Sequence, residues 1–453
     1  LTVSVALAVS SAHANEYVIE KLAKPSSQQV ALTLDPAKDN FSGHTEIALE
    51  VLKATNYIEL NGIDYAVSMA KILGAENCDL SAEMLKTGKV KFSCDEKIQP
   101  GKYTLKVDFT APYNRQSVGL YKTLDQGTPY LFTQFEMSDA RRAFPVFDEP
   151  SYKIPFQLTI TAPTSQKVYA NTPVLKTKVD GDMTTHFFDK TPPIPSYLVA
   201  MAVGPFEELE IKGMPIPGRV LTPQGKIHLA DYAKENMPRV LKALEDYFGI
   251  PYVYKKLDSV AVPEFPFGAM ENAGLVTYRE DILLVDLATA TRSKKERNVS
   301  IIAHELAHQW YGNLVTMKWW NDLWLNEAFA SWMAAKITAQ INPEFESHLD
   351  LPQNYVMALD ARLSTKPIRK PIKTEADIMD GLGLAYSKGS AVLSMVENWI
   401  GEEAFQQGIR AYLKKFSYKN AEAADLWQAL GEASNKDVAS VLKSFIEQSS
   451  FPL

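Results

Sequence analysis

Alternating apolar and polar positions dominate the first half of the chain. Residues 47–51, 103–109 and 156–160 each place a hydrophobic side chain at every second position. This period of two is typical of a β-strand with one buried face. Clusters of turn-forming residues separate the runs, for example at 35–40 and 179–182. The pattern therefore predicts an antiparallel β domain with one face toward solvent.

The periodicity changes beyond about residue 210. Helical spacing of apolar residues is followed by Gly249 and Pro251, which are typical of a helix end. Short apolar runs resemble buried strands, and beyond residue 293 most of the chain has a helical period. The segments with the strongest signals are helices at 236–248, 421–434 and 437–447 and strands at 259–262 and 275–278.

Together these patterns predict an α+β fold with two domains. The N-terminal antiparallel β domain is expected at 15–207, and a mostly helical second domain at 208–453. A length of 453 residues suits two to four domains.

The first residues of the chain have the character of a targeting segment. Residues 1–14, LTVSVALAVSSAHA, are apolar and small and end in an A-x-A pattern. This is typical of the last part of a secretory signal peptide, so an exported protein, periplasmic or secreted, is expected. No later apolar run reaches the 18 residues that a membrane helix needs, so no membrane span is expected.

The net charge and the cysteine content limit which partners and which metal sites this chain can have. With 47 basic and 54 acidic residues the net charge is −7, which disfavours nucleic acid as a partner. Cys78 and Cys94 lack the spacing of a metal site. They either form one disulfide, as in exported proteins, or remain two buried thiols. The oligomeric state is not indicated.

A metal-binding motif stands in the second half, within IIAHELAHQWYG at 301–312. In a helix, His304 and His308 lie one turn apart on the same face, so both imidazoles can bind one Zn²⁺. Glu305 lies beside them, where it can activate a water molecule. Because the chain has only 7 histidines, a chance match is improbable. The opposite side of the helix is apolar, through Val299, Ile302, Ala303, Leu306 and Trp310.

A catalytic zinc site needs a third protein ligand. Glu327 follows His308 with eighteen residues between them and opens a second predicted helix, 326–339, which is apolar and therefore buried. An acidic residue in a first helical turn can simply interact with the helix dipole. A ligand role is the better interpretation, because a buried carboxylate is tolerated on a metal.

These motifs resemble those of the aminopeptidase N family of zinc aminopeptidases, which are gluzincins. The family has a zinc signature, an exopeptidase motif, two upstream segments and a catalytic tyrosine. The matching segments are His304–His308 with Asn326–Ala330, Gly268–Asn272, 134–136 with 141–150, and Tyr386 within 385–390. One departure is Ala328, where the family more often has glycine.

The resemblance implies a thermolysin-like catalytic domain. It also implies a chain truncated before the small β domain and the helical C-terminal domain into which this family usually continues.

The resemblance further implies an activity, a cofactor and roles for particular residues. One Zn²⁺ per chain would be held by His304, His308 and Glu327, and the substrates would be peptides with a free N-terminus. Glu305 would act as general base, and Tyr386 would donate its hydroxyl to the oxyanion. Carboxylates would bind the substrate's α-ammonium group. The implied substrate-binding residues are Gln134, Glu136, Gly268, Ala269, Met270, Glu271 and Asn272.

Several of these residues have simpler interpretations. Glu271 could be a solvated turn carboxylate, and Met270 could serve only packing. Asp322 could support a zinc-binding histidine, but a surface or capping role is favoured.

Other functions share part of the pattern. A thermolysin-type endopeptidase has the same zinc motif but no use for paired carboxylates at an ammonium site. A leukotriene-A hydrolase-like epoxide hydrolase usually has glycine at the position of Ala269. A zinc-stabilised binding fragment without activity is the non-enzymatic alternative.

Overall fold

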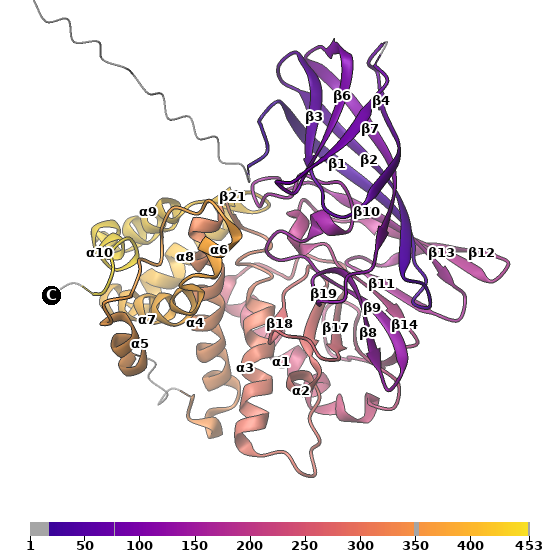
Figure 1. Cartoon of the computed structure of the whole chain (residues 1–453). Coiled ribbons are helices and arrows are strands. Elements are labelled where there is room, and N and C mark those ends of the chain that lie inside the picture. Colours follow the sequence, from indigo (N-terminus) through magenta and orange to yellow (C-terminus); the bar gives the residue numbers. More distant parts are fainter. Residues whose placement is uncertain (1–17, 77, 348–352, 452–453) are drawn as a thin grey trace, which may run out of the picture.

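The computed structural model describes residues 18–76, 78–347 and 353–451. The predicted signal-peptide remnant, 1–14, lies outside this range. A β-rich half and a helix-rich half pack against each other (Figure 1). This arrangement confirms the predicted α+β fold. Among the described helices, none combines the length and the apolar composition needed to cross a membrane.

The first half is built on a large twisted sheet (Figure 1). Its burial alternates along the strands, as the period of two predicted, so one face supplies the core. In spatial order its strands are β12 (Val174–Asp180), β13 (Met183–Lys190), β10 (Phe156–Pro163), β1 (Ala23–Thr33), β2 (Asn40–Val51), β7 (Gly101–Pro112) and β4 (Ala66–Leu73).

The prediction of a wholly antiparallel domain is wrong at one place. Strands β1 and β10 pair in parallel, with Gln28 opposite Phe156. They are separated by more than a hundred residues, so local periodicity gave no signal of their relative direction. A parallel pair requires a long crossover, and here β2 to β9 supply it.

Two smaller sheets complete this half. The first is β3 (Thr55–Asn61), β6 (Lys89–Ile98) and β5 (Ser81–Leu85), and Cys78 is disulfide-bonded to Cys94 of β6. The structure thus settles the two alternatives for these cysteines. The second sheet is β11 (Lys167–Ala170), β14 (Met201–Gly204), β9 (Thr128–Gln134) and β8 (Gly119–Asp125).

A mixed sheet opens the second half. Its order is β15 (Glu207–Glu210), β16 (Gly218–Thr222), β17 (Leu257–Val262), β19 (Leu275–Arg279) and β18 (Ala269–Met270). Strands β16, β17 and β19 run parallel to one another and are almost fully buried, as parallel strands usually are. The division between residues 207 and 208 remains a prediction.

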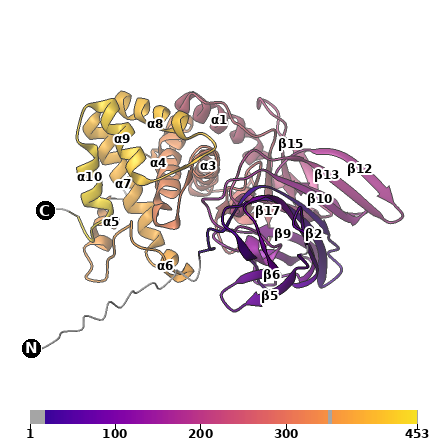
Figure 2. The same cartoon turned by 90° about the horizontal axis from the view of Figure 1, so that it is seen from above.

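Helices form the rest of the second half, together with a short pair of strands, β20 (Thr316–Met317) and β21 (Asn420–Ala421). In both views α4 lies between α3 and α7 (Figures 1 and 2). The helices are α1 (Asp231–Phe248), α2 (Glu280–Leu283), α3 (Arg292–Ala307), α4 (Trp324–Ile341), α5 (Gln353–Asp360), α6 (Glu375–Met379), α7 (Leu382–Ile400), α8 (Glu402–Phe416), α9 (Ala423–Ser434) and α10 (Val438–Ile446).

The predicted helices and strands of this half are present, with shifted ends. Helix α1 begins five residues before the predicted start at residue 236, and its end at Gly249 is as predicted. The glycine adopts a left-handed conformation there, which satisfies the helix C-terminus without the strain of a side chain. The apolar stripe of α3 is buried as expected, including Val299, Ile302 and Leu306.

Candidate metal and active site

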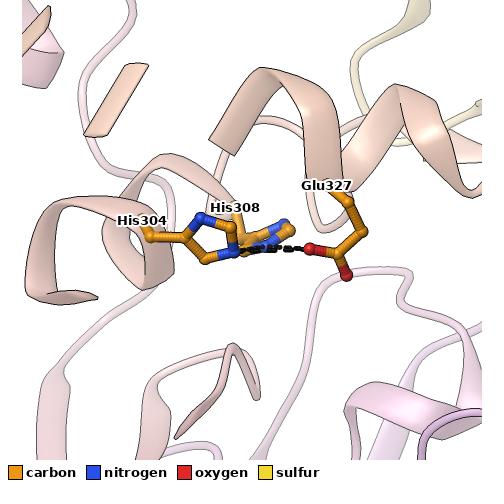
Figure 3. A group of neighbouring side chains, drawn as sticks. All are labelled: His304, His308 and Glu327. Atoms are coloured by element: carbon orange, nitrogen blue, oxygen red, sulfur yellow. Dashed lines mark hydrogen bonds and ion pairs between the residues drawn. The ribbon is translucent and has the colours of Figure 1, made fainter. Parts of the chain in front are cut away.

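Helices α3 and α4 bring two imidazoles and one carboxylate to a single point. His304 is in the last turn of α3, His308 is its C-cap, and Glu327 is in the first turn of α4. Figure 3 shows the three side chains pointing toward one another. The Nε2 atoms of the two histidines are 3.1 Å apart, and Glu327 Oε2 lies 3.3 Å and 3.4 Å from them.

This arrangement fits a divalent metal ion. Two ligand atoms that each lie about 2.1 Å from Zn²⁺ at the tetrahedral angle are about 3.4 Å apart, close to the distances found. Two imidazole nitrogens and a carboxylate oxygen all present electron pairs to the same space, which is unfavourable unless a cation lies between them. Residues His304, His308 and Glu327 could therefore hold a metal ion by their geometry as well as by their residue types.

A backbone contact holds His308 in a ligand orientation. The Nδ1 atom of His308 lies 3.0 Å from the carbonyl oxygen of Tyr311, so it donates there and leaves Nε2 for the metal. Gly312 has φ of +114°, and a β-carbon on it would lie 3.3 Å from His308 Nδ1. A glycine at this position thus permits the tight turn behind the imidazole.

The candidate catalytic and substrate-binding residues line an adjoining cavity of about 490 Å³. Its walls come from both halves of the molecule. Among the described residues, those of the predicted site that line it are Gln134, Glu136, Gly268, Ala269, Met270, His304, Glu305, Glu327 and Tyr386. The ring of Tyr386 is nearly parallel to that of His304, with centroids 6.0 Å apart.

Two of the predicted substrate-binding residues, Glu271 and Asn272, are not among the residues that line this cavity. Glu271 is buried, with Oε1 3.8 Å from His308 Nδ1, and its carboxylate still lies within 4.8 Å of those of Glu136 and Glu327. The alternative of a solvated turn carboxylate is therefore wrong. Asn272 is buried and donates to Thr277 Oγ1 at 3.3 Å, so it supports the strand rather than facing the cavity.

Sequence reasoning missed the residues that fix the backbone around Glu271. The side-chain amides of Gln309 and Asn313 donate to the Glu271 carbonyl at 3.0 Å and 2.8 Å. Both residues follow His308 closely in sequence. Their proximity to the metal motif was the one feature of the sequence that could have indicated a role near the site. Ser331 was missed as well, and its hydroxyl lies 3.5 Å from His304 Nδ1. It stands one helical turn after Glu327 and therefore on the same face.

Asp322 is not in contact with a zinc-binding histidine. It is buried, and its carboxylate accepts from Arg369 Nε at 2.7 Å and from the backbone N–H of Ala423 at 3.3 Å. The prediction of a surface position for Asp322 is therefore wrong. Its contact with the first backbone N–H group of α9 is similar to that of a helix-capping residue. The partners are distant in sequence, so no local pattern indicated them.

Burial and mutual charge control titration in the cavity. Burial raises the pKa of Glu305 and that of Glu136, and in both cases neighbouring carboxylates raise it further. Burial acts in the same direction on Glu327, but the imidazoles of His308 and His304 hold its pKa at about 2. Burial also raises the pKa of Tyr386, so its phenol keeps its proton.

The fold and this site define a class of protein in which a β-rich first half is joined to a helical second half that carries a His-Glu-x-x-His motif. Two family models match the chain: the peptidase M1 N-terminal domain over residues 24–198, and the peptidase family M1 domain over residues 232–445. The chain belongs to peptidase family M1.

Named relatives are similar over nearly all of this chain. Aminopeptidase 2 of Candida albicans is 38% identical over 434 residues, covering 93% of this chain and 47% of that protein. Aminopeptidase M1 of Arabidopsis thaliana is 34% identical over 452 residues, covering 96% and 51%. Glutamyl aminopeptidase of Bos taurus is 36% identical over 435 residues, covering 92% and 46%. The chain thus spans about half the length of the curated relatives it matches.

Proposed function

We propose that this protein is a zinc aminopeptidase that hydrolyses the first peptide bond of substrates with a free α-amino group. The observation that carries the proposal is a set of buried acceptor oxygens without donors. Among the described residues, Gln134 Oε1, Glu136 Oε1 and Glu271 Oε1 have no hydrogen-bond partner. An α-ammonium group has three N–H donors and one positive charge, and it satisfies such a set.

The position of these acceptors fits cleavage after the first residue. Glu136 and Glu271 lie within 4.8 Å of the metal ligand Glu327, so an ammonium group bound to them is close to the metal site. An internal peptide segment has no cation to place there and would leave buried carboxylates unpaired. This geometry supports an exopeptidase over an endopeptidase.

The chain's own residues supply binding and proton transfer. Bound at His304, His308 and Glu327, zinc would supply a Lewis acid that polarises the scissile carbonyl group and lowers the pKa of water. Glu305 is buried beside this site and accepts the proton of the attacking water, then delivers it to the leaving amine. Tyr386 keeps its proton and donates a hydrogen bond to the carbonyl oxygen as charge develops.

The substrate backbone is positioned by the edge strand β18. Its residues Ala269 and Met270 pair with β19 on one side, and both line the cavity. Gly268 precedes them, and its carbonyl accepts from Arg279 N at 2.9 Å. The free edge of β18 offers backbone groups to an extended peptide, as in other complexes formed by strand addition. Met270 then contacts the first side chain of the substrate.

A pair of substrates tests this function. The protein with one equivalent of zinc should hydrolyse an alanyl peptide with a free N-terminus and leave the N-acetylated form of the same peptide intact. A chelator should abolish the activity, and added zinc should restore it. Equal rates on the free and acetylated peptides would overturn the ammonium site and favour an endopeptidase.

Metal content tests the cofactor separately. We expect one zinc per chain by elemental analysis, because the three ligands and the cavity provide one complete site. Replacing His304 by Ala should remove the metal, whereas replacing the exposed His228 should not. Binding of zinc to both variants alike would contradict the assignment of the ligands.

An exported location is proposed from the character of residues 1–14 and from the bonded pair Cys78–Cys94. Disulfides of this kind persist in oxidising compartments. Fractionation of the producing cells should place the protein outside the cytoplasm. In that fraction Cys78 and Cys94 should not react with a thiol reagent, because they are bonded to each other. Recovery only from cytoplasm, with both thiols reactive, would overturn the proposal.

A further inference from the structure

The turn that carries Glu271 is buried, and each of its backbone carbonyls is hydrogen-bonded. It comprises residues 271–274, between β18 and β19, and we name it the Glu271 turn. A buried turn has no access to water, so its carbonyl oxygens need donors from the protein. The donors are the amides of Gln309 and Asn313 for Glu271, the N–H of Leu275 for Asn272, the amide of Asn171 for Ala273, and Lys256 Nζ with the N–H of Asp258 for Gly274.

Asn171 is the donor that comes from the β half of the molecule. It directly follows β11 and is 3% exposed. Its Nδ2 donates to the carbonyls of Ala273 at 2.9 Å and Leu198 at 2.7 Å, and its Oδ1 accepts from the N–H of Ala200 at 2.8 Å. Because both N–H groups and the oxygen are engaged, the orientation of the amide is fixed. Asn171 therefore holds the Glu271 turn against the β half.

The backbone of Asn171 packs as closely on the turn as its side chain does. Gly274 has φ of +72°, and a β-carbon on it would lie 2.3 Å from the carbonyl oxygen of Asn171. A glycine is required here both for the left-handed conformation and for the close approach of the two backbones. The turn consequently has little room to shift relative to Asn171.

The carboxylate of the same turn lacks what its backbone has. Glu271 is 3% exposed, and its Oε1 has no hydrogen-bond partner among the described residues. A backbone whose carbonyls are all bonded thus presents an acceptor that no described protein group satisfies. Ordering such a group before a ligand arrives lowers the cost of binding, because less conformational freedom is lost. The anchored turn is suited to hold a ligand's cation at one fixed place.

We propose that Asn171 is a positioning residue for recognition of the substrate's α-ammonium group. It is not among the residues that line the cavity, and it acts through the Ala273 carbonyl on the placement of Glu271 two residues earlier. The inference rests on the proposed aminopeptidase function, which assigns the ammonium group to Glu271. Loss of the Asn171 amide should weaken the binding of ligands that carry an α-amino group and spare ligands that lack it.

Two metal-binding ligands that differ in one amino group test the proposal. Alanine hydroxamate and propionic hydroxamate share the zinc-binding group and the methyl group, and only the first has an α-ammonium group. The measured quantity is the ratio of their dissociation constants for the zinc-loaded protein, determined by calorimetry. In the wild type we expect the amino form to bind about tenfold more tightly or better, since hydrogen bonds between charged groups are strong.

Asn171→Ala should reduce this preference about tenfold and leave the affinity for propionic hydroxamate unchanged. A displacement of about 1 Å in a recognition group is enough for a loss of this size. The matched control is Asn420→Ala, which should leave the preference unchanged. Asn420 also donates its Nδ2 to two carbonyls, those of Pro150 at 2.8 Å and Met317 at 3.1 Å, and also connects the two halves. Neither carbonyl belongs to the Glu271 turn.

Asn171→Asp is the second variant if the first does not fold. It has nearly the same volume and keeps an acceptor for the N–H of Ala200, but it removes the donor to Ala273. An unchanged preference in a folded, zinc-loaded Asn171 variant would overturn the proposal. An equal reduction in Asn420→Ala would overturn it too, because the effect would then follow from loosened packing in general.

Hydrogen exchange keeps the positioning role separate from the proposed function. Amide exchange within residues 271–275 should become about tenfold faster in Asn171→Ala and stay unchanged in Asn420→Ala, because only the first variant removes an anchor of the turn. If the wild type binds both hydroxamates equally, the ammonium site fails, and faster exchange confined to Asn171→Ala still supports the anchoring of Glu271. Exchange that is the same in the wild type and in Asn171→Ala would overturn the positioning role, whichever hydroxamate binds better.

Discussion

The metal site depends on residues that are close in the chain and few in number. His304 and His308 come from the last turn and the C-cap of one helix, and Glu327 from the first turn of another; His308 and Glu327 are buried, and His304 is partly buried. Glu305 adds a carboxylate whose burial makes it hold a proton more tightly than a surface glutamate does. At this scale the residue types are those of the hydrolytic centre that we propose.

Replacing Glu305 by Gln should separate catalysis from metal binding. Its side chain is not among the three ligands, so zinc content should remain one per chain. The loss of a positioned general base should lower kcat by about 10² to 10⁴-fold. Steady-state kinetics on a free peptide, with elemental analysis of the same sample, measures both quantities. Retention of wild-type kcat would exclude Glu305 as the base.

Asp139, at the cavity rim, should couple stability to pH. Burial raises its pKa to about 6, against the opposing hydrogen bond from Arg142. The folded state therefore binds the carboxyl proton of Asp139 more tightly than the unfolded state does. The free energy of unfolding of the protein consequently falls as pH rises from about 4 to 6. Asp139→Asn does not titrate. The stability of wild type relative to this variant should fall by on the order of 2 kcal/mol over that window.

Urea denaturation at several pH values, with a chelator present throughout, measures this difference. Other titrating groups are common to both proteins and cancel. A difference that does not change between pH 4 and pH 7 would show that Asp139 titrates normally in the folded state.

At the scale of elements, the site depends on how α3 packs against α4. Tyr311 follows the zinc motif and stacks on Phe329 of α4, with centroids 4.2 Å apart and rings nearly parallel. Both rings are buried. This contact sets the separation of the two elements that hold the ligands, so packing energy and metal geometry are linked here.

Phe329→Ala should therefore reduce both stability and zinc affinity. Removal of a buried phenylalanine ring usually costs about 3–5 kcal/mol of unfolding free energy, through lost burial and the remaining cavity. Phe187→Ala, a partly exposed ring on β13, is the control and should cost about 1 kcal/mol or less. Chemical denaturation and zinc titration of both variants test this. Equal losses of stability and zinc affinity in the two variants would contradict a role for the stacking of Tyr311 on Phe329.

At the scale of the molecule, the β half and the helical half form one site together. Gln134 and Glu136 come from the β half, and the metal ligands come from the helical half. Lys153 joins the halves directly: its ammonium group donates to the carbonyls of Asn313 and Leu314 at 2.8 Å and 2.9 Å. Those residues follow the zinc motif, so the β half supports the loop behind it.

Lys153→Met should weaken this connection while preserving the length of the side chain. The carbonyls would lose charge-assisted hydrogen bonds, so we expect a loss on the order of 2–3 kcal/mol of stability and weaker zinc binding. Lys178→Met, at an exposed position of β12, is the matched control and should change neither. If both variants behave alike in denaturation and zinc titration, Lys153 does not couple the two halves.

Local patterns in the sequence determined much of this protein. The period of two predicted the strands, and the His-Glu-x-x-His spacing with an acidic first turn predicted the metal ligands, because each signal depends on residues within one or two elements. Family resemblance extended the prediction to Glu136, Glu271 and Tyr386. The structure places Glu136 and Tyr386 on the cavity wall and the carboxylate of Glu271 within 4.8 Å of those of Glu136 and Glu327.

Only the tertiary structure decided the features that join distant segments. These are the parallel pairing of β1 with β10, the bonding of Cys78 to Cys94 and the contact of Asp322 with Arg369. Each depends on which buried surfaces meet. Burial against a distant partner is a property of the packed chain, and the short-range periodicity of hydrophobic residues carries no information about it.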